Sequence, residues 1–175
     1  MTRLLKELNF NISLAHCNFS LRAKESDGDE KFVINLADKL SIPVFNKTFD
    51  TKKYAEDQKI STQMAARDLR YDWFEELCKK HGFDFLLTAH HLDDDMETFF
   101  INLSRGTGLR GLTGIPVVNE KIIRPFLIFS RDEILDYAKA NNIVWREDSS
   151  NSKTDYLRNK LRLEVLPKFK DISEQ

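Results

Sequence analysis

One short segment holds most of the side chains in this sequence that could do chemistry. Residues 88–98 contain two adjacent histidines, three consecutive aspartates and a glutamate. These residue types transfer protons and bind metal ions near neutral pH. Aspartates in the first turn of a helix often only cap the helix and complement its dipole, which explains one or two of the three. Capping does not explain His90 and His91, or Glu97 one turn later.

This segment lies where a strand is expected to end and a helix to begin. Residues 83–87 form a short apolar run of the kind that buried parallel strands show. Ligands of open α/β sheets bind at the carboxyl ends of the strands, so the junction is the expected ligand site. Apolar residues recur at helical spacing after it, namely Met96, Phe99, Phe100 and Leu103.

The side chains of segment 88–98 could also bind a divalent cation. Magnesium usually takes one or two protein carboxylates and completes its coordination with phosphate oxygens and water. Zinc is disfavoured, because no further histidine or cysteine is placed to complete a tetrahedral site. If a metal binds here, the sequence favours magnesium.

Four of the six glycines lie in residues 104–114. Glycine-rich backbone can cradle phosphate groups. This segment does not match the G-x-x-x-x-G-K-[ST] loop, and it does not lie between a strand and a helix as the G-x-G-x-x-G fingerprint requires. A phosphate cradle and a structural turn both stay open.

Two arginine pairs lie at helical spacing, Arg67 with Arg70 and Arg158 with Arg162. An arbitrary pair of this kind most often lies on a solvated helix face. Residues 153–171 add a modest basic excess, with six lysines and arginines against three acids. This excess is consistent with a phosphate or tRNA contact, but it is weak evidence alone.

The composition restricts the class of protein. With 175 residues, 41% of them hydrophobic and 31% charged, the chain is large enough for one globular domain. A net charge of −1 argues against a generic polyanion binder. The two cysteines form no C-x-x-C pair, which argues against a structural zinc site or a redox pair. Reduced thiols fit a cytosolic protein. No apolar run approaches a membrane span and no signal peptide is evident, so we expect a cytoplasmic protein without a membrane contact.

Strands alternate with helices along the chain, which predicts an α/β fold with a doubly wound parallel sheet. Ser26 and Asp29 are expected to cap a helix that continues to Leu40, and a polar loop is expected up to Lys59. Further helices are expected at residues 2–9, 61–81, 130–141 and 156–169, strands at 12–16, 43–49 and 83–87, and a hairpin or final strand at 115–126.

Six segments in chain order resemble the tRNA(Ile)-lysidine synthetase family, a member of the N-type ATP pyrophosphatase (PP-loop) group. The first contains His16-Cys17-Asn18-Phe19-Ser20-Leu21-Arg22, and the third contains Ala89-His90-His91-Leu92-Asp93-Asp94. Six ordered motifs are a far more specific signal than any one of them. The matching segments are 16–27, 66–71, 89–98, 105–112, 124–125 and 148–162.

The resemblance implies a two-step reaction on a tRNA anticodon. ATP adenylates C2 of the wobble cytidine of an isoleucine tRNA and releases pyrophosphate. The amine of free lysine then displaces AMP and leaves lysidine. ATP, Mg²⁺, lysine and tRNA are therefore the expected cofactors and partners, in an adenine-nucleotide alpha-hydrolase-like fold.

The resemblance also assigns residues. His90 and Asp94 match the reaction centre, and Asp94 is the expected magnesium ligand. Arg70 and Arg162 match arginines that handle triphosphate or tRNA, where cations offset charge on the departing pyrophosphate. The expected cofactor-binding side chains are His16, which borders the nucleotide, and Arg67, His91, Asp93 and Arg158.

The chain departs from the family pattern in two places. Phe19 and Ser20 stand where the family usually has a histidine and a glycine. The family's phosphate loop, S-G-G-x-D-S, is absent, and the sequence starts inside the helix expected after that loop. We therefore expect residues 1–175 to be a single, N-terminally truncated catalytic domain that is inactive alone, with a basic helix region at about 153–170. Strands near 12–17 and 84–90 should then flank the missing central strand of a 3-2-1-4-5 sheet.

Two other functions stay open. A related PP-loop tRNA thiolase is one, although sulfur-transferring members tend to carry paired cysteines, and Cys17 and Cys78 do not pair in the sequence. A non-catalytic fragment that only binds RNA or a partner is the other.

Overall fold

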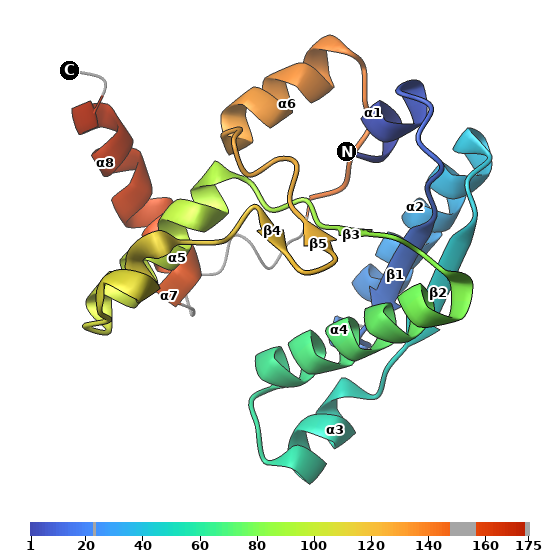
Figure 1. Ribbon diagram of the computed structural model, residues 1–175, viewed down its shortest axis with the longest axis horizontal. Helices are drawn as coiled ribbons and strands as arrows, with labels where there is room; N and C mark the ends of the chain where they lie inside the picture. Colours follow the sequence, from blue (N-terminus) through green and yellow to red (C-terminus); the bar gives the residue numbers. More distant parts are fainter. Residues whose placement is uncertain (23, 148–156, 174–175) are drawn as a thin grey trace. The chain divides into compact units, whose positions relative to one another are not determined.

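The computed structural model describes residues 1–22, 24–147 and 157–173. The chain divides into two compact units, Met1–Asp84 and Phe85–Gln175, and each is described by itself (Figure 1). No helix in the described part of the chain is both long and apolar enough to cross a membrane. The single domain expected from the sequence stays a prediction.

The first unit is built on one parallel strand pair. β1 (Leu14–Asn18) pairs with β2 (Val44–Thr48) in register from Leu14 opposite Val44 to Asn18 opposite Thr48. The connection between them contains α2 (Lys24–Leu40), as parallel pairing requires a long crossover. The other helices of this unit are α1 (Thr2–Glu7), α3 (Thr51–Gln58) and α4 (Thr62–His81).

The core of the first unit is aromatic. Phe49, Trp73 and Leu77 are buried together, and the Phe49 and Trp73 rings meet edge to face with centroids 6.1 Å apart. Helix α4 supplies Trp73 and Leu77, and its ends follow its sequence signals: Ser61 caps it and Gly82 ends it at φ 68°. Partly buried residues packed against this core are Cys17, Phe19, Phe45, Leu69 and Phe74.

Three sequence-based boundaries in the first unit are wrong. Helix α2 begins at Lys24, so Ser26 is a buried residue inside the helix rather than its cap, and its hydroxyl accepts from the Arg22 N–H at 3.2 Å. Strand β1 continues to Asn18. The expected polar loop contains α3, whose N-terminus is capped by Asp50 through the Lys53 N–H at 3.1 Å.

The second unit has its own small sheet. β3 (Leu86–Leu87) pairs in parallel with β5 (Ile122–Ile123), and β4 (Val118–Asn119) completes the expected hairpin antiparallel to β5. In the expected 3-2-1-4-5 order the missing strand is number 1, β1 and β2 are numbers 2 and 3, and β3 and β5 are numbers 4 and 5. The pairings β1–β2 and β3–β5 match the two outer pairs of that order. The expected arrangement, in which β1 and β3 flank a missing central strand, stays a prediction. Among its described residues, this unit contains the helices α5 (Leu92–Ser104), η1 (Leu109–Thr113), α6 (Arg131–Ala140), α7 (Leu157–Lys160) and α8 (Leu166–Ser173), and a π-helical turn described below.

The basic segment near the end of the chain is helical, as predicted. A π-helical turn, η3 (Leu161–Val165), joins α7 to α8 just before Pro167, which has no N–H to continue a regular helical bond. Leu166, only 2% exposed, anchors this segment in the second unit. Residues 148–156, which include the last matching motif's Asp148-Ser149-Ser150-Asn151 and the expected helix start at Tyr156, lie outside the described residues.

Candidate active site

The N-terminus of α5 is closed by a histidine. The N–H of Asp94 donates to Nδ1 of His91 at 3.4 Å, and the Asp94 carboxylate accepts from the His91 N–H at 3.0 Å. This reciprocal capping box replaces the capping by aspartate alone that the sequence suggested. His91 and Asp94 are thereby fixed to the end of the helix.

His90 is held by its neighbour on the strand side. Its Nδ1 lies 2.8 Å from the hydroxyl oxygen of Thr88. Thr88 in turn donates its N–H to the carbonyl of Ile123 at 3.1 Å, which continues the β3–β5 pairing. The ring of His90 therefore stands on the edge of the small sheet, between strand β3 and helix α5.

Glu97 is the centre of an ion-pair network and is fully buried, at 0% exposure. Arg162 binds it with two nitrogens, Nε at 2.6 Å and Nη2 at 3.1 Å, and Nε of Arg158 lies 3.4 Å from the same carboxylate. Burial raises the pKa of Glu97 above its ordinary value, although Arg162 and Arg158 oppose that rise. The contact fixes the helical segment that begins with α7 against α5.

The same arginine reaches the expected reaction centre. Nη2 of Arg162 lies 3.2 Å from Oδ1 of Asp94. Burial alone would lower the pKa of Arg162, but the carboxylates of Glu97, Asp94 and Asp93 outweigh it and raise that pKa. Arg162 is therefore a permanent cation among carboxylates. Arg158 also donates to the hydroxyl of Thr98 at 3.1 Å.

Asp93 joins three elements of the second unit. Its carboxylate accepts from the N–H of Arg131 in the first turn of α6 at 2.7 Å and pairs with Lys170 of α8. Burial pushes the pKa of Asp93 upward, but Lys170 and the Arg131 N–H outweigh it, so the pKa lies below the ordinary value. These contacts give Asp93 a structural role, and its assignment to cofactor binding stays a prediction.

The glycine-rich segment packs back onto α5. Asp95 accepts from the N–H of Ile115, and Asn102 donates to the carbonyl of Gly111 at 2.8 Å. Gly114 has φ 69°, and a side chain there would collide with the Asp95 carboxylate. These contacts favour the structural turn over the phosphate cradle.

The two arginines of the first unit lie on aromatic rings. The guanidinium of Arg70 lies 5.1 Å from the ring centre of Phe19, and that of Arg67 lies 4.9 Å from Tyr71. Neither arginine has a hydrogen bond or ion pair with another described residue. Phe19, which departs from the family pattern, is thus the ring beneath an expected triphosphate-binding arginine.

His16 lies on β1 of the first unit. Its Nε2 is buried and has no hydrogen-bond partner among the described residues. Burial lowers the pKa of His16, while the carboxylates of Glu30 and Asp29 oppose that shift. Nearby, the Asn18 amide donates to Glu30 at 2.8 Å, which ties the end of β1 to α2.

The expected site residues therefore fall into two sets. His90, at the β3–α5 junction, belongs to the second unit, as does the network of His91, Asp93, Asp94, Arg158 and Arg162. His16, Arg67 and Arg70 belong to the first unit. Sequence reasoning gave no role to Glu97, Thr98 or Lys170. Glu97 carried a signal, one helical turn after Asp94, whereas Lys170 was noted only within the basic excess of residues 153–171.

Comparison with known proteins gives the family. Residues 1–169 match the family described as PP-loop domain. The chain belongs to the PP-loop family. This confirms both the resemblance noted in the sequence and the α/β fold with parallel strands and helices.

Relatives of this PP-loop chain are named tRNA(Ile)-lysidine synthase. The protein of Porphyromonas gingivalis is 44% identical over 171 residues, which are 97% of this chain and 38% of that protein. Those of Bacteroides thetaiotaomicron and Petrotoga mobilis are 42% and 41% identical over 173 residues, 99% of this chain and 41% and 55% of those proteins. The chain thus spans about two fifths to just over half of these relatives.

A solved structure shares the fold. It is a U34-tRNA thiolase from Methanococcus maripaludis, with a TM-score of 0.69 and 16% identity, covering 99% of this chain and 66% of that one. At this identity the likeness concerns the PP-loop fold alone.

The described part of the PP-loop chain was expected to hold magnesium through Asp94, but it contains no preformed group of metal ligands. Among the described residues, no three His, Cys, Asp or Glu side chains are grouped to hold a metal ion. Asp94, the expected magnesium ligand, already accepts from the His91 N–H and pairs with Arg162. The described side chains therefore form no preassembled magnesium site. The assignment of Asp94 to magnesium stays a prediction.

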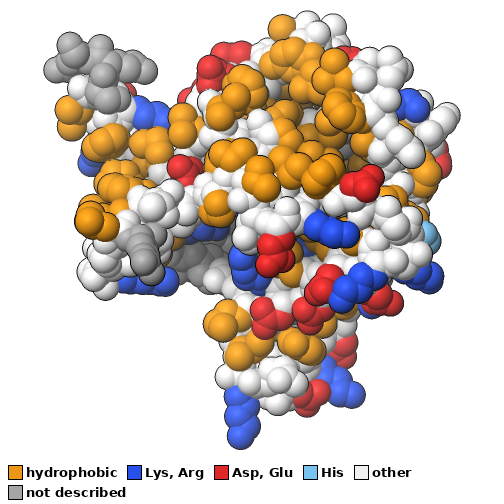
Figure 2. Space-filling view, viewed as in Figure 1, with side chains coloured by type: hydrophobic (Ala, Val, Ile, Leu, Met, Phe, Trp, Pro, Cys, Tyr) orange, Lys and Arg blue, Asp and Glu red, His pale blue; other side chains and the backbone are white. Residues whose placement is uncertain are grey.

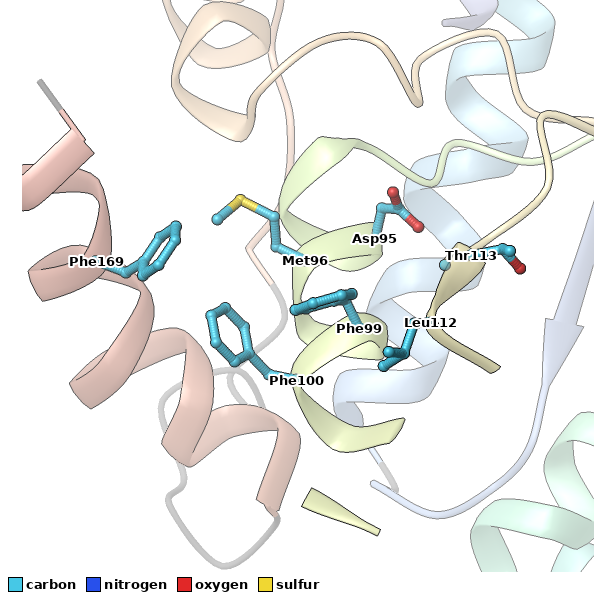
Figure 3. A pocket seen from close by; sticks show the side chains of 8 residues that line it. Asp95, Met96, Phe99, Phe100, Leu112, Thr113 and Phe169 are labelled. Atoms are coloured by element: carbon cyan, nitrogen blue, oxygen red, sulfur yellow. The ribbon is translucent and has the colours of Figure 1, made fainter. Parts of the chain in front are cut away.

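A mostly apolar cavity of about 240 Å³ lies against α5 in the second unit. Phe100 and Met96 of α5 face Phe169 of α8 across it (Figure 3). The Phe100 and Phe169 rings meet edge to face with centroids 5.4 Å apart. Because the cavity is lined by aromatic rings, a triphosphate is not its expected ligand.

Over the α7–α8 part of the molecule, hydrophobic and basic side chains lie side by side on the surface (Figure 2).

Proposed function

We propose that this chain is the catalytic PP-loop domain of an ATP-dependent enzyme that joins lysine to the wobble cytidine of an isoleucine tRNA. The observation that carries the proposal is the 44% identity with a tRNA(Ile)-lysidine synthase over 97% of the chain. The residues at the β3–α5 junction support it, because the expected reaction centre lies at the end of a strand of the parallel sheet. We expect the enzyme to act in the cytoplasm.

The proposed reaction has two steps. The oxygen on C2 of the cytidine attacks the α-phosphorus of ATP, and pyrophosphate leaves with the electrons of the broken P–O bond. The amine of free lysine then attacks C2, and AMP leaves with the electrons of the C2–O bond while the amine loses a proton. ATP is consumed as a substrate, and Mg²⁺ is expected to accompany the nucleotide.

The residues take different parts in this proposal. His90 and Asp94 serve at the reaction centre. Arg70, whose N–H groups have no partner among the described residues, suits the phosphate oxygens of ATP or tRNA. Arg162 holds Asp94 in place and adds positive charge beside it. His16, Arg67, His91, Asp93 and Arg158 stay assigned to nucleotide binding or to support of these residues.

A PP-loop thiolase is the less favoured alternative. The chain has two cysteines, both free thiols in the first unit. Burial raises the pKa of Cys17 to about 11, although Arg70 and Lys47 pull it down, so this thiol is a poor thiolate at neutral pH. The likeness to a tRNA thiolase concerns the fold alone.

The test is an assay of the complete protein with ATP, radiolabelled lysine and an isoleucine tRNA transcript. Pyrophosphate release should depend on tRNA, and lysine should enter the tRNA one for one with AMP. In a parallel reaction with a sulfide donor in place of lysine, incorporation of sulfur into the tRNA would favour the thiolase. RNA binding without pyrophosphate release would favour the non-catalytic alternative. Residues 1–175 alone should not turn over, because they contain no S-G-G-x-D-S loop.

A further inference from the structure

The hydroxyl of Thr88 has one hydrogen-bond partner in the described part of the chain, Nδ1 of His90, at 2.8 Å. A hydroxyl can donate to a bare ring nitrogen or accept from a protonated one. These two arrangements give His90 opposite chemistry. With the proton on Nε2, that atom donates a hydrogen bond, and with the proton on Nδ1, Nε2 is a base.

The backbone of Thr88 is fixed by a hydrogen bond just past the end of β3. Its N–H donates to Ile123 at 3.1 Å, one step beyond the paired residues Leu87 and Ile123 of the β3–β5 ladder. Its branched Cβ restricts the side-chain torsion that aims the hydroxyl. On the other side of His90, the N–H of His91 is fixed by Asp94. The backbone is therefore anchored both before and after His90.

The two histidines differ in what their rings do. Nδ1 of His91 accepts from the N–H of Asp94 and so serves the helix cap. Nδ1 of His90 faces a side-chain hydroxyl instead. A hydroxyl whose one hydrogen-bond partner among the described residues is a histidine nitrogen has no evident capping role, which points to control of the ring itself.

We propose that Thr88 is a positioning residue for His90: its hydroxyl donates to Nδ1 and thereby keeps the neutral ring in the tautomer with its proton on Nε2. This inference rests on the proposed function, in which His90 serves the reaction centre. With the proton on Nε2, His90 acts as a hydrogen-bond donor toward the oxygens that gain negative charge as pyrophosphate leaves.

The test compares two variants of nearly the same shape. Thr88→Val removes the hydroxyl, and Thr88→Ser keeps it. In the complete protein labelled with ¹⁵N-histidine, long-range ¹H–¹⁵N spectra read the tautomer of each ring. The chain has four histidines, so loss of one signal set in His90→Gln assigns the signals of His90.

The wild-type protein and Thr88→Ser should show the Nε2–H tautomer of His90, and Thr88→Val should show a mixture. The adenylation rate should fall roughly tenfold in Thr88→Val, with KM for ATP and tRNA unchanged, and Thr88→Ser should restore most of it. An Nδ1–H tautomer in the wild type, or a single Nε2–H tautomer with full rate in Thr88→Val, would overturn the proposal.

Two controls separate this inference from its premises. If Thr88→Val does not fold, as judged by its melting temperature, Thr88→Ala replaces it in the comparison with Thr88→Ser. If His90→Gln keeps full adenylation activity, the catalytic assignment of His90 fails. The tautomer measured in the wild type without substrate then still decides whether Thr88 controls the ring.

Discussion

The two arginine pairs of this chain are held in opposite ways. In the first unit, Arg67 and Arg70 lie on aromatic rings and have no ionic partner among the described residues. In the second unit, Arg158 and Arg162 are bound to the buried carboxylate of Glu97. A ring orients a guanidinium through its face and leaves the N–H edge available for phosphate. In the second unit the Glu97 carboxylate binds the N–H groups that would otherwise be available for phosphate.

This difference in partners suggests different roles for the two arginine pairs, ligand binding for one and support of the fold for the other. The two pairs, three and four residues apart, were equal candidates for phosphate contacts in the sequence. In the structure the first-unit pair contacts aromatic rings, and the second-unit pair clamps α5 to the segment from α7 to α8. We infer that the first pair binds ligand and that the second pair supports the fold. Substitutions in the first pair should therefore reduce activity, and substitutions in the network around the second should reduce stability.

The largest expected loss of stability is at Glu97. Glu97→Gln removes the charge between two arginines in a site with no exposure. We expect it to lower the free energy of unfolding by about 3 kcal/mol, because one side of a buried ion pair is left uncompensated. Urea denaturation measures this loss. Glu75→Gln, which breaks the exposed pair with Lys79, is the control and should leave the free energy of unfolding almost unchanged. Equal effects of the two substitutions would remove the distinction between the two arginine pairs.

The next effect concerns Arg70. Arg70→Ala should lower kcat/KM for ATP roughly thirtyfold, about 2 kcal/mol of transition-state stabilisation, with little change in unfolding. The reason is that its guanidinium makes no hydrogen bond or ion pair with another described residue that its loss would break. Steady-state kinetics and a urea titration of the same preparation check both parts. A variant that loses stability and keeps its rate per folded molecule would place Arg70 in the scaffold.

A smaller effect is expected from the ring beneath that arginine. Phe19→Leu keeps an apolar side chain of similar volume but removes the aromatic face 5.1 Å from Arg70. A partly exposed cation–π contact of this kind contributes about 1 kcal/mol or slightly less, so KM for ATP should rise about threefold. The double variant with Arg70→Ala should add nothing further. Additive effects would mean that the ring does not act through the arginine.

The smallest effect is a shift with pH at Asp93. Its pKa in the folded protein lies below the ordinary range, so the unfolded chain binds this proton more readily. The stability it contributes is present above about pH 4 and is lost as the pH falls through the folded pKa. Lys170→Met should move the midpoint of acid unfolding upward by roughly a few tenths of a pH unit. Lys139→Met, which removes an exposed pair with Asp136, should leave it unchanged.

Much of the site could be predicted from the sequence because its signals are local. An apolar run followed by helical spacing placed the β3–α5 junction correctly, and Ser61 and Gly82 marked the ends of α4. Helix α3 was missed because its residues are polar and carry no apolar stripe. The cap of α5 was missed because histidine is not a preferred capping residue.

The partners of the carboxylates could not be predicted for a different reason. Arg162 is 65 residues from Glu97 in the chain, and Lys170 is farther still from Asp93. Helical spacing identifies which residues share a face, but it does not say which face of another element they meet. For the same reason the sequence did not predict that Arg70 lies over the ring of Phe19.

The most direct test of the account is the adenylation step in His90→Ala. Single-turnover release of pyrophosphate from ATP in the presence of tRNA should fall about 10²- to 10³-fold, as expected for loss of a side chain that serves the transition state. The melting temperature should stay within about 2 °C, because the helix cap belongs to His91 and not to His90. An unchanged rate per folded molecule, together with a lowered melting temperature, would contradict the account and make His90 a structural residue.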